Sequence, residues 1–228
     1  MKHELFQADS RRLDRLADGS VDLVVCSPPA PMHPFWKNSI FNGMSWDDMH
    51  NYLLETWREC FRVMKPNAVM CIDAADVAER NNDGTYTIYP NYTKYVEKLL
   101  QLGFKLIKTI VWVKSGLKNL NKQDCDHILV FNKIDRSINP NTWVWRLGRE
   151  KKGSYPIEIP LRLIKLFSRK GDLVLDPFVG RGTTSVACEI LDRTSIGFDI
   201  NSEVLNDAEK RLHARTILCA EEVQLIGE

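Results

Sequence analysis

The segment Asp176-Pro-Phe-Val-Gly-Arg-Gly-Thr-Thr184 is the feature that most constrains the fold of this chain. It follows the short apolar run 172–175 and leads into the run 183–191, so it predicts a strand, a glycine-rich turn and a helix. Glycines let a backbone approach a ligand closely, and the first turn of a helix has N–H groups without partners. Asp199 ends the next apolar run, where an acid can accept hydrogen bonds from ribose hydroxyls. Together these features predict a site for a nucleoside cofactor.

The spacing of the glycines narrows the type of cofactor. Gly180-Arg-Gly182 lacks the third glycine of the dinucleotide fingerprint G-x-G-x-x-G, so the turn favours S-adenosyl-L-methionine. The chain has no G-x-x-x-x-G-K-[ST] loop, which disfavours an ATPase. The simpler alternative is a plain strand-to-helix turn with incidental glycines. The Asp-Pro-Phe prefix, the Thr-Thr helix start and Asp199 favour the cofactor site.

Strands and helices alternate along the chain, which predicts one α/β domain over residues 1–228 with helices on both faces of a sheet. The expected strands are 21–26, 68–72, 104–114, 127–132, 172–175 and 194–198. The expected helices are 48–64, 92–102, 160–168, 183–191 and 201–215. Residues 134–153 show little periodicity, and we expect an irregular surface segment there.

A second turn, Ser27-Pro28-Pro29, directly follows the predicted strand 21–26, at the strand end where open α/β sheets place their chemistry. Two prolines fix the backbone, so the Ser27 hydroxyl and the neighbouring carbonyls point in set directions. Two acceptors that hold the N–H bonds of a base amine raise the electron density on its nitrogen and align it for attack. Alone, the turn is better explained as a strand ended by prolines. Beside the glycine-rich turn, it predicts methyl transfer to a base amine.

Composition argues against several other classes of protein. The chain has 44% hydrophobic and 27% charged residues, as a soluble globular domain does. No apolar run approaches the ~20 residues of a membrane helix, and the first residues lack the apolar core of a signal peptide, so we expect a cytoplasmic protein without a membrane partner. The six cysteines form no C-x-x-C pair and the histidines have no ligand spacing, so no metal is predicted.

One local segment indicates nucleic acid as a partner, although the net charge of +1 creates no global field. Basic and aromatic residues that can contact phosphates and stack on bases cluster between positions 143 and 153. The expected substrate contacts in this cluster are Trp143, Trp145, Arg146 and Arg149.

These motifs give the chain a resemblance to the β group of S-adenosylmethionine-dependent amino-methyltransferases, which modify cytosine N4 or adenine N6 in DNA. In that group a Ser-Pro-Pro or Asp-Pro-Pro motif precedes the cofactor motif, a circularly permuted order, and this chain has the same order. The resemblance covers nearly the whole chain and implies a Rossmann-like methyltransferase fold with a mostly parallel twisted sheet. Further matching segments are Asp9, Asp18-Gly-Ser-Val-Asp-Leu-Val-Val25, Arg62-Val-Met-Lys-Pro66, Ile110-Val-Trp-Val-Lys114 and Tyr155-Pro-Ile-Glu-Ile-Pro160.

The resemblance also implies roles for single residues. Ser27, Pro28 and Pro29 are the expected catalytic residues that hold the target amine, and a serine at the first position is typical of cytosine N4 enzymes. Asp199 is expected to bind the ribose and Asp9 the adenine amine of the cofactor. The full set of expected cofactor-binding residues is Asp9, Pro156, Asp176, Phe178, Gly180, Gly182, Thr183 and Asp199.

The chain departs from the resembled group in two places. The residue after Pro29 is normally an aromatic that stacks on the flipped base, but here it is Ala30, and we expect Phe35 or Trp36 to replace it. DNA methyltransferases that read a sequence usually carry a sizeable recognition region before the cofactor motif. Here the only segment available for recognition of the substrate is 134–153. So short a segment suits an RNA recognised by its shape, a short or relaxed DNA site, or a homodimer in which both subunits contribute to recognition.

The leading hypothesis from the sequence is therefore a methyltransferase acting on the N4 amine of cytosine in DNA. One alternative is N4-cytidine methylation of a structured RNA such as ribosomal RNA, and another is N6-adenine methylation, which Ser27 does not exclude. A catalytically impaired nucleic-acid-binding protein is the alternative from a different class. The intact Ser-Pro-Pro turn and Asp199 argue against it.

Overall fold

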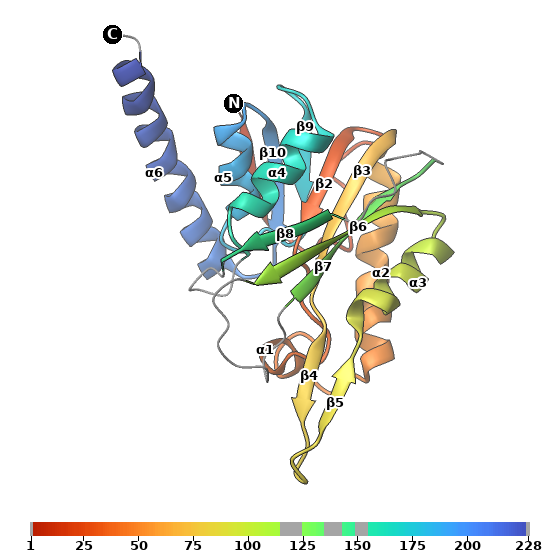
Figure 1. Cartoon of the computed structure of the whole chain (residues 1–228). Helices are drawn as coiled ribbons and strands as arrows, with labels where there is room; N and C mark the ends of the chain where they lie inside the picture. Colours follow the sequence, from red (N-terminus) through yellow and green to blue (C-terminus); the bar gives the residue numbers. More distant parts are fainter. Residues whose placement is uncertain (1, 115–124, 135–142, 149–154, 227–228) are drawn as a thin grey trace.

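The computed structural model describes residues 2–114, 125–134, 143–148 and 155–226, and in the last helix it describes side chains up to residue 214. Its centre is an eight-stranded sheet of order β1-β10-β9-β2-β3-β7-β6-β8 (Figure 1). Strand β7 runs antiparallel to both of its neighbours, and the other pairings of this sheet are parallel, so the predicted mostly parallel sheet is confirmed. The strands are β1 His3–Gln7, β2 Val21–Cys26, β3 Met64–Ala74, β6 Lys105–Lys114, β7 Cys125–Asn132, β8 Trp143–Leu147, β9 Leu173–Asp176 and β10 Thr194–Asp199.

Helices cover both faces of the sheet, as predicted. Helices α2 (Trp46–Val63) and α3 (Asn91–Gln101) bury their apolar sides in one core cluster, and α4 (Glu158–Phe167) and α5 (Thr183–Ile190) in a second. Helix α6 (Ser202–Ile226) packs against α5, and a short helix α1 (Pro34–Lys37) follows β2.

Period-two alternation along the strands assigns each side chain to one of the two cores. In β2, Val24 and Cys26 face α2 and α3, whereas Leu23 and Val25 face α4 and α5. The same alternation places the next residue, Ser27, on the α4 side of the sheet. The strand pattern therefore decides which groups the Ser27 hydroxyl can reach.

The expectation of an irregular segment at residues 134–153 is wrong for Trp143–Leu147. These residues form the edge strand β8, which pairs in parallel with β6. Trp145 and Leu147 are each only 8% exposed, while the intervening Arg146 is exposed. Period-two alternation over five residues is a short signal, and here packing against the second core, not local propensity, fixes the strand. Residues 135–142 and 149–153 of the expected recognition segment lie outside the described residues.

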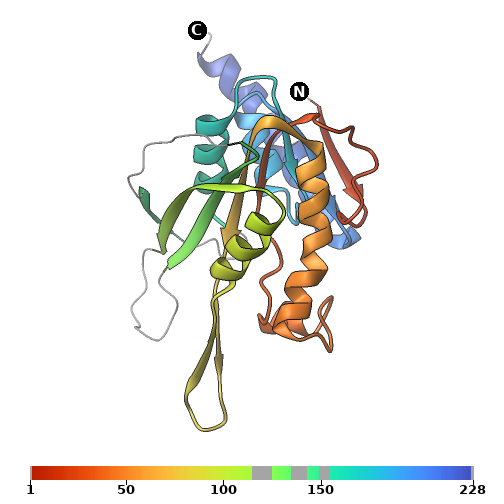
Figure 2. The same ribbon diagram turned by 90° about the vertical axis from the view of Figure 1, so that its right-hand side faces the viewer.

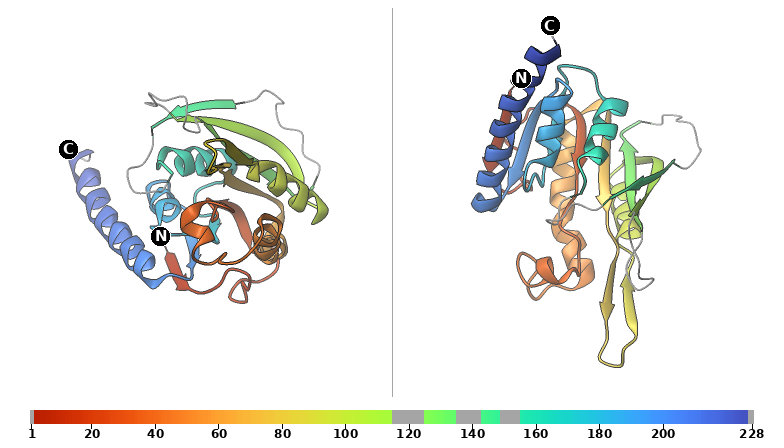
Figure 3. Two further views of the ribbon diagram at one scale, coloured as in Figure 1. Left: turned by 90° about the horizontal axis from the view of Figure 1, so that it is seen from below. Right: turned by 60° about the vertical axis from the view of Figure 1, so that its left-hand side comes forward.

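Two further elements had no clear sequence pattern. Strand β1 adds to the sheet beside β10, and a hairpin of β4 (Val77–Arg80) and β5 (Tyr86–Tyr89) follows β3. Residues 81–85 form the tip of this hairpin, which projects from the domain (Figure 2). It leaves the same end of the domain as the loop that carries α1 (Figure 3).

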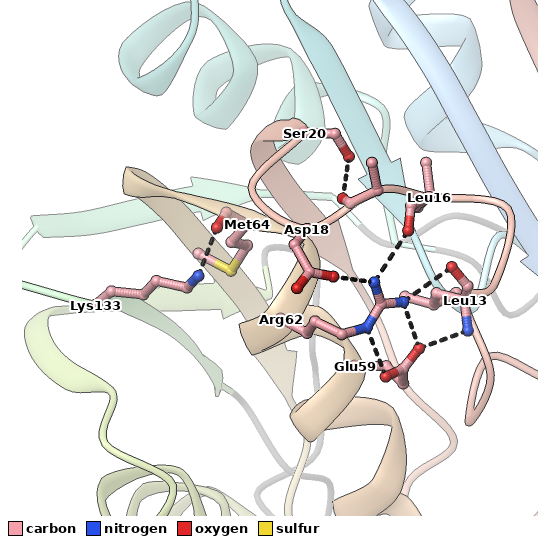
Figure 4. A network of polar contacts seen from close by, with 9 residues as sticks. Leu13, Leu16, Asp18, Ser20, Glu59, Arg62, Met64 and Lys133 are labelled. Atoms are coloured by element: carbon pink, nitrogen blue, oxygen red, sulfur yellow. Dashed lines mark hydrogen bonds and ion pairs between the residues drawn. The ribbon is translucent and has the colours of Figure 1, made fainter.

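The opposite edge of the sheet, where β2 begins, is held by Arg62 near the end of α2 (Figure 4). Its guanidinium donates to both carboxylate oxygens of Glu59 at 2.9 and 2.7 Å, and to Asp18 Oδ1 at 2.6 Å. It also donates to the carbonyls of Leu13 and Leu16, at 3.1 and 3.0 Å. We call this set the Arg62 clamp, because it fixes the loop between β1 and β2 to α2.

No helix in the described parts of the chain is long and apolar enough to cross a membrane. The same residues contain no group of three or more His, Cys, Asp or Glu side chains arranged to hold a metal ion.

Candidate active site

The two turns singled out in the sequence lie side by side in the structure. Strands β2 and β9 are parallel neighbours, with Val24 opposite Leu175. Ser27 follows β2 and Asp176 ends β9, so both turns leave the carboxyl edge of the sheet. Open α/β sheets bind their ligands in the crevice outside the carboxyl ends of their strands, and both turns lie at this edge.

The glycine-rich turn is anchored to the neighbouring strand by Asp199. Gly180 N donates to Asp199 Oδ2 at 3.0 Å, and Asn201 N donates to Oδ1 at 2.9 Å. Partial burial raises the pKa of Asp199 above its usual value, although these hydrogen bonds oppose the shift. The carboxylate is therefore held in one orientation at the end of β10, beside the turn.

Glycine is needed at the two positions of the turn for different structural reasons. Both have positive φ angles, 48° for Gly180 and 75° for Gly182, which favour glycine. A Cβ atom at Gly180 would meet nothing closer than the Phe178 carbonyl oxygen at 3.9 Å, so this position has room for a ligand. A Cβ atom at Gly182 would lie 2.8 Å from Ala208 Cβ, so Gly182 allows α6 to approach. Binding of a cofactor by these two residues remains a prediction.

Asp176 lies under the turn and holds it from within. Its Oδ1 accepts from Phe178 N at 3.0 Å, and its Oδ2 accepts from the Thr184 hydroxyl at 2.5 Å. The Tyr155 hydroxyl lies 2.5 Å from the same Thr184 oxygen. Burial raises the pKa of Asp176 to about 7, because a charged carboxylate is poorly solvated there.

Ser27 contacts a carboxylate that the sequence reading did not single out. Its Oγ donates to Oδ2 of Asp73, near the end of β3, at 3.1 Å. Burial, and then the negative charge of Asp126, raise the pKa of Asp73 to about 7. Asp73 Oδ1 is buried and has no hydrogen-bond partner in the described parts of the chain. An acid placed just after the expected strand 68–72 was the available signal, but sequence alone did not pair it with Ser27.

The loop after the two prolines is held by the buried side chain of Asn91. Its Nδ2 donates to the carbonyls of Pro31 and Ala75, both at 3.0 Å. Its Oδ1 accepts from Trp46 Nε1 at 2.7 Å and is 3.0 Å from His50 Nε2. Burial lowers the pKa of His50 to about 4, so the ring is neutral near neutral pH and serves as a donor to Asn91. Nothing in the local sequence around Asn91 indicated this role.

The remaining expected cofactor residues surround the same edge. Asp9 follows β1 and is paired with Arg11, whose Nη2 lies 2.6 Å from Asp9 Oδ2. The Phe178 ring packs edge-on against Trp57 at 5.6 Å. Pro156 is buried just before α4, and Thr183 begins α5. The structure brings the turn residues together, while their contacts with a cofactor remain predictions.

The expected substrate residues fall into two separate groups. Phe35 and Trp36 lie on α1, in the loop that follows the Ser-Pro-Pro turn, and Phe35 is 64% exposed. Trp143, Trp145 and Arg146 lie on β8, which β3, β7 and β6 separate from β2.

The expectation of a base-stacking loop at β8 needs correction, because Trp145 is buried in the second core cluster. The guanidinium of Arg162 also lies 5.3 Å from the centre of its ring. Arg149 lies outside the described residues.

The mostly parallel sheet, the glycine-rich turn and the adjacent Ser-Pro-Pro turn define a Rossmann-like protein of the methyltransferase class. A family model described as DNA methylase, for N6 and N4 methyltransferases, matches residues 21–155 and 137–210. The chain belongs to this DNA methylase family, and its cofactor is S-adenosyl-L-methionine. The resemblance, the fold class and the cofactor predicted from the sequence are thereby confirmed, whereas the choice between cytosine and adenine is not decided.

Individual proteins agree with this assignment. The type II methyltransferase M.MjaI of Methanocaldococcus jannaschii is 30% identical in an alignment that covers 92% of this chain and 91% of that relative. TTHA0409 of Thermus thermophilus, described as a DNA modification methylase and solved with S-adenosyl-L-methionine, superposes with a TM-score of 0.79 at 26% identity. That match covers 93% of this chain and 94% of the solved one. The cytosine-N4-specific PvuII DNA methyltransferase has a TM-score of 0.76 at 16% identity over 92% of this chain and 86% of its own, which shows the shared fold.

Proposed function

We propose that this chain transfers a methyl group from S-adenosyl-L-methionine to the N4 amine of cytosine in DNA. The observation that carries the proposal is the hydrogen bond from Ser27 Oγ to Asp73, directly beside the glycine-rich turn. The Ser27 hydroxyl is a polar acceptor for the amine, and the Asp73 carboxylate is hydrogen-bonded to that hydroxyl. Ser27 follows β2, the strand next to the one that leads into the cofactor turn. A base amine needs both the hydroxyl and the carboxylate, because it must be held in place and must lose a proton.

The residues of the glycine-rich turn fit the cofactor. The open position at Gly180 gives a ligand access to the backbone, and the oriented carboxylate of Asp199 can accept from ribose hydroxyls. Phe178 adds an aromatic face that is fixed by Trp57. When bound, S-adenosyl-L-methionine supplies a methyl group on a positively charged sulfur, which is a good leaving group.

Ser27 and Asp73 give the amine proton a route away from the nitrogen. As the amine gained the methyl group and the methyl–sulfur bond broke, leaving a neutral thioether, the amine N–H proton would pass to Ser27 Oγ, and the Ser27 hydroxyl proton would pass to Asp73 Oδ2. Asp73 ends as a carboxylic acid, so it must be ionised at the start. Because its pKa is raised to about 7, the transfer rate is expected to fall as the pH drops below neutral.

The choice of cytosine rests on Ser27, the residue typical of cytosine N4 enzymes in the resembled group. The PvuII enzyme, whose fold is shared, is described as cytosine-N4-specific, which is consistent with this choice. Phe35 and Trp36 are the proposed stacking residues in place of Ala30, because they lie in the loop that follows the two prolines.

Methyl transfer with a labelled methyl group, followed by mass spectrometry of the nucleosides, tests the proposal. Matched double-stranded DNA and structured RNA should be offered in parallel, and light scattering of the same samples should report whether a homodimer forms. N4-methyldeoxycytidine is the expected product. N6-methyldeoxyadenosine would assign the adenine reaction, and N4-methylcytidine would assign the RNA reaction. Cofactor binding without transfer to any substrate would contradict the proposal.

A further inference from the structure

A row of polar side chains crosses the carboxyl edge of the sheet on the side of α4. Five strands that are consecutive in the sheet, β9, β2, β3, β7 and β6, each place one such residue in or just after their ends. Residues two positions away along these strands, such as Val25, Cys71, Ile128 and Trp112, belong to the second core cluster, so the alternation places the row on the same face. We call the members the polar row: Asp176, Ser27, Asp73, Asp126 and Lys114.

Asp126 and Lys114 form a buried ion pair at the far end of this row. Lys114 Nζ lies 2.5 Å from Asp126 Oδ2, and the two side chains are 9% and 5% exposed. A buried ion pair loses hydration on both partners and often contributes little net stability. We therefore looked for a role of this ion pair other than stability. Its neighbour in the polar row is Asp73.

We propose that Asp126 and Lys114 are positioning residues that control how readily Asp73 accepts the proton from Ser27. This inference rests on the proposed function, in which Asp73 is the final proton acceptor. Neither residue needs to contact the base or the cofactor, because charges act on Asp73 through the poorly screened interior.

The two charges act on Asp73 in opposite directions. The Asp126 carboxylate disfavours a second negative charge and raises the pKa of Asp73, whereas the Lys114 ammonium lowers it. Cys26 on β2, Tyr95 on α3 and Tyr155 before α4 also interact with Asp73. Burial raises the pKa of each of these groups well above its usual value, so they carry no charge near neutral pH. Among the described residues, the charged groups that act on Asp73 are thus the two partners of this ion pair.

Two single variants test this assignment, because they must shift the pH dependence in opposite directions. Asp126→Asn removes the negative charge that raises the pKa of Asp73 and keeps the positive charge of Lys114, so the pH below which the transfer rate falls should move lower by about one unit. Lys114→Met leaves two carboxylates together, so this pH should move higher by about one unit. A purely structural role would lower activity in both variants without opposite shifts.

The double variant Asp126→Asn/Lys114→Met guards against misfolding, because it removes both charges of the ion pair together. Since Asp126 has the larger influence of the two, the double variant should show a small shift to lower pH. Lys170→Met is the matched control, since it breaks the exposed ion pair with Asp192 and should leave the profile unchanged. Circular dichroism of each variant should confirm the fold.

The closing experiment measures the titration of Asp73 directly, by NMR of protein with ¹³C-labelled aspartate carboxyls, with Asp73→Asn used for assignment. Single-turnover transfer rates at saturating cofactor and DNA give the parallel kinetic profile. Opposite shifts in the two single variants, or the small downward shift in the double variant if the singles fail to fold, support the inference. No shift, or shifts in one direction, would overturn it. Opposite NMR shifts in a chain that methylates no nucleic acid would overturn the proposed function instead.

Discussion

The Arg62 clamp and the polar row are both built from charged side chains, at opposite edges of the same sheet. In the clamp, all three guanidinium nitrogens of Arg62 donate to carboxylate or carbonyl oxygens (Figure 4). In the polar row, Asp73 Oδ1 has no partner in the described residues, and the pKa values of Asp73 and Asp176 are raised to about 7.

This difference indicates that the clamp stabilises the fold, whereas the polar row takes part in the reaction. In the clamp, Arg62 lowers the pKa of Glu59, so both groups are most stable in their charged forms. In the row, burial destabilises the charged forms of Asp73 and Asp176, and carboxyl groups with raised pKa values are typical of functional sites. We therefore expect substitutions in the row to change the reaction and substitutions in the clamp to change the stability.

The largest expected effect is that of Ser27→Ala. Without the hydroxyl, the amine loses both an acceptor and its route to Asp73, so the transfer rate should fall about 10²- to 10⁴-fold. Cofactor affinity, measured by isothermal titration calorimetry, should stay within about twofold, since the turn at Gly180 is untouched. Ser27→Thr keeps the hydroxyl and should restore part of the rate. A comparable loss of cofactor affinity in Ser27→Ala would break the separation of the two turns.

Asn91→Ala should have the next largest effect on the reaction. It frees the Pro31 and Ala75 carbonyls and so loosens the loop after the two prolines. We expect kcat to fall about 10- to 100-fold through misalignment, with cofactor affinity nearly unchanged. Asn51→Ala is a useful control, because Asn51 lies on the exposed side of α2, where its side chain accepts a hydrogen bond from Lys98 Nζ. Equal losses of kcat in both variants would argue against a role for Asn91 in alignment.

Arg62→Met should change stability instead. It removes the charged hydrogen bonds to Glu59, Asp18 and two carbonyls, and we expect a loss of about 2–3 kcal/mol in the free energy of unfolding. Urea denaturation monitored by circular dichroism measures this loss. Below the unfolding transition, the single-turnover rate should stay within about threefold of the parent. A rate loss as large as that of Ser27→Ala would show that the two edges are not functionally separate.

The smallest effect concerns the pH dependence of stability. Because the pKa of Asp176 is about 7 in the folded chain and about 3.9 when unfolded, the folded state binds more protons between these values. Its contribution therefore lowers the free energy of unfolding as the pH rises from about 4 to 7.

Asp176→Asn should flatten this slope by on the order of 1–2 kcal/mol between pH 5 and pH 8. Urea denaturation at both pH values measures it. Glu59→Gln provides the contrast, because the lowered pKa of Glu59 adds stability that is lost only in acid. An unchanged slope in Asp176→Asn would show that its carboxyl is not perturbed as described.

Much of this architecture could be predicted because its signals are local. Apolar strands and amphipathic helices indicated the α/β sheet, and the motif 176–184 indicated the turn that joins β9 to α5. The two turns were expected to cooperate, and the pairing of β2 with β9 places them side by side.

The parts that were missed depend on contacts between distant segments. Asp73 reaches Ser27 only because β2 and β3 are parallel neighbours, and Lys114 reaches Asp126 across the β6–β7 pair. Strand β8 was missed because its short alternation of Trp and Leu was read as an irregular basic segment. No pattern in one segment can show which charges its neighbours bring.

The most direct test of the division between the two edges is the single-turnover transfer rate of Asp73→Asn at pH 8, with saturating cofactor and DNA. An asparagine keeps the size of the side chain and can still accept from Ser27, but it cannot take up the proton. The rate should fall at least about 100-fold, while the fold and the cofactor affinity are retained. A rate within about threefold of the parent would contradict the account, because the carboxylate behind Ser27 would then have no part in the reaction.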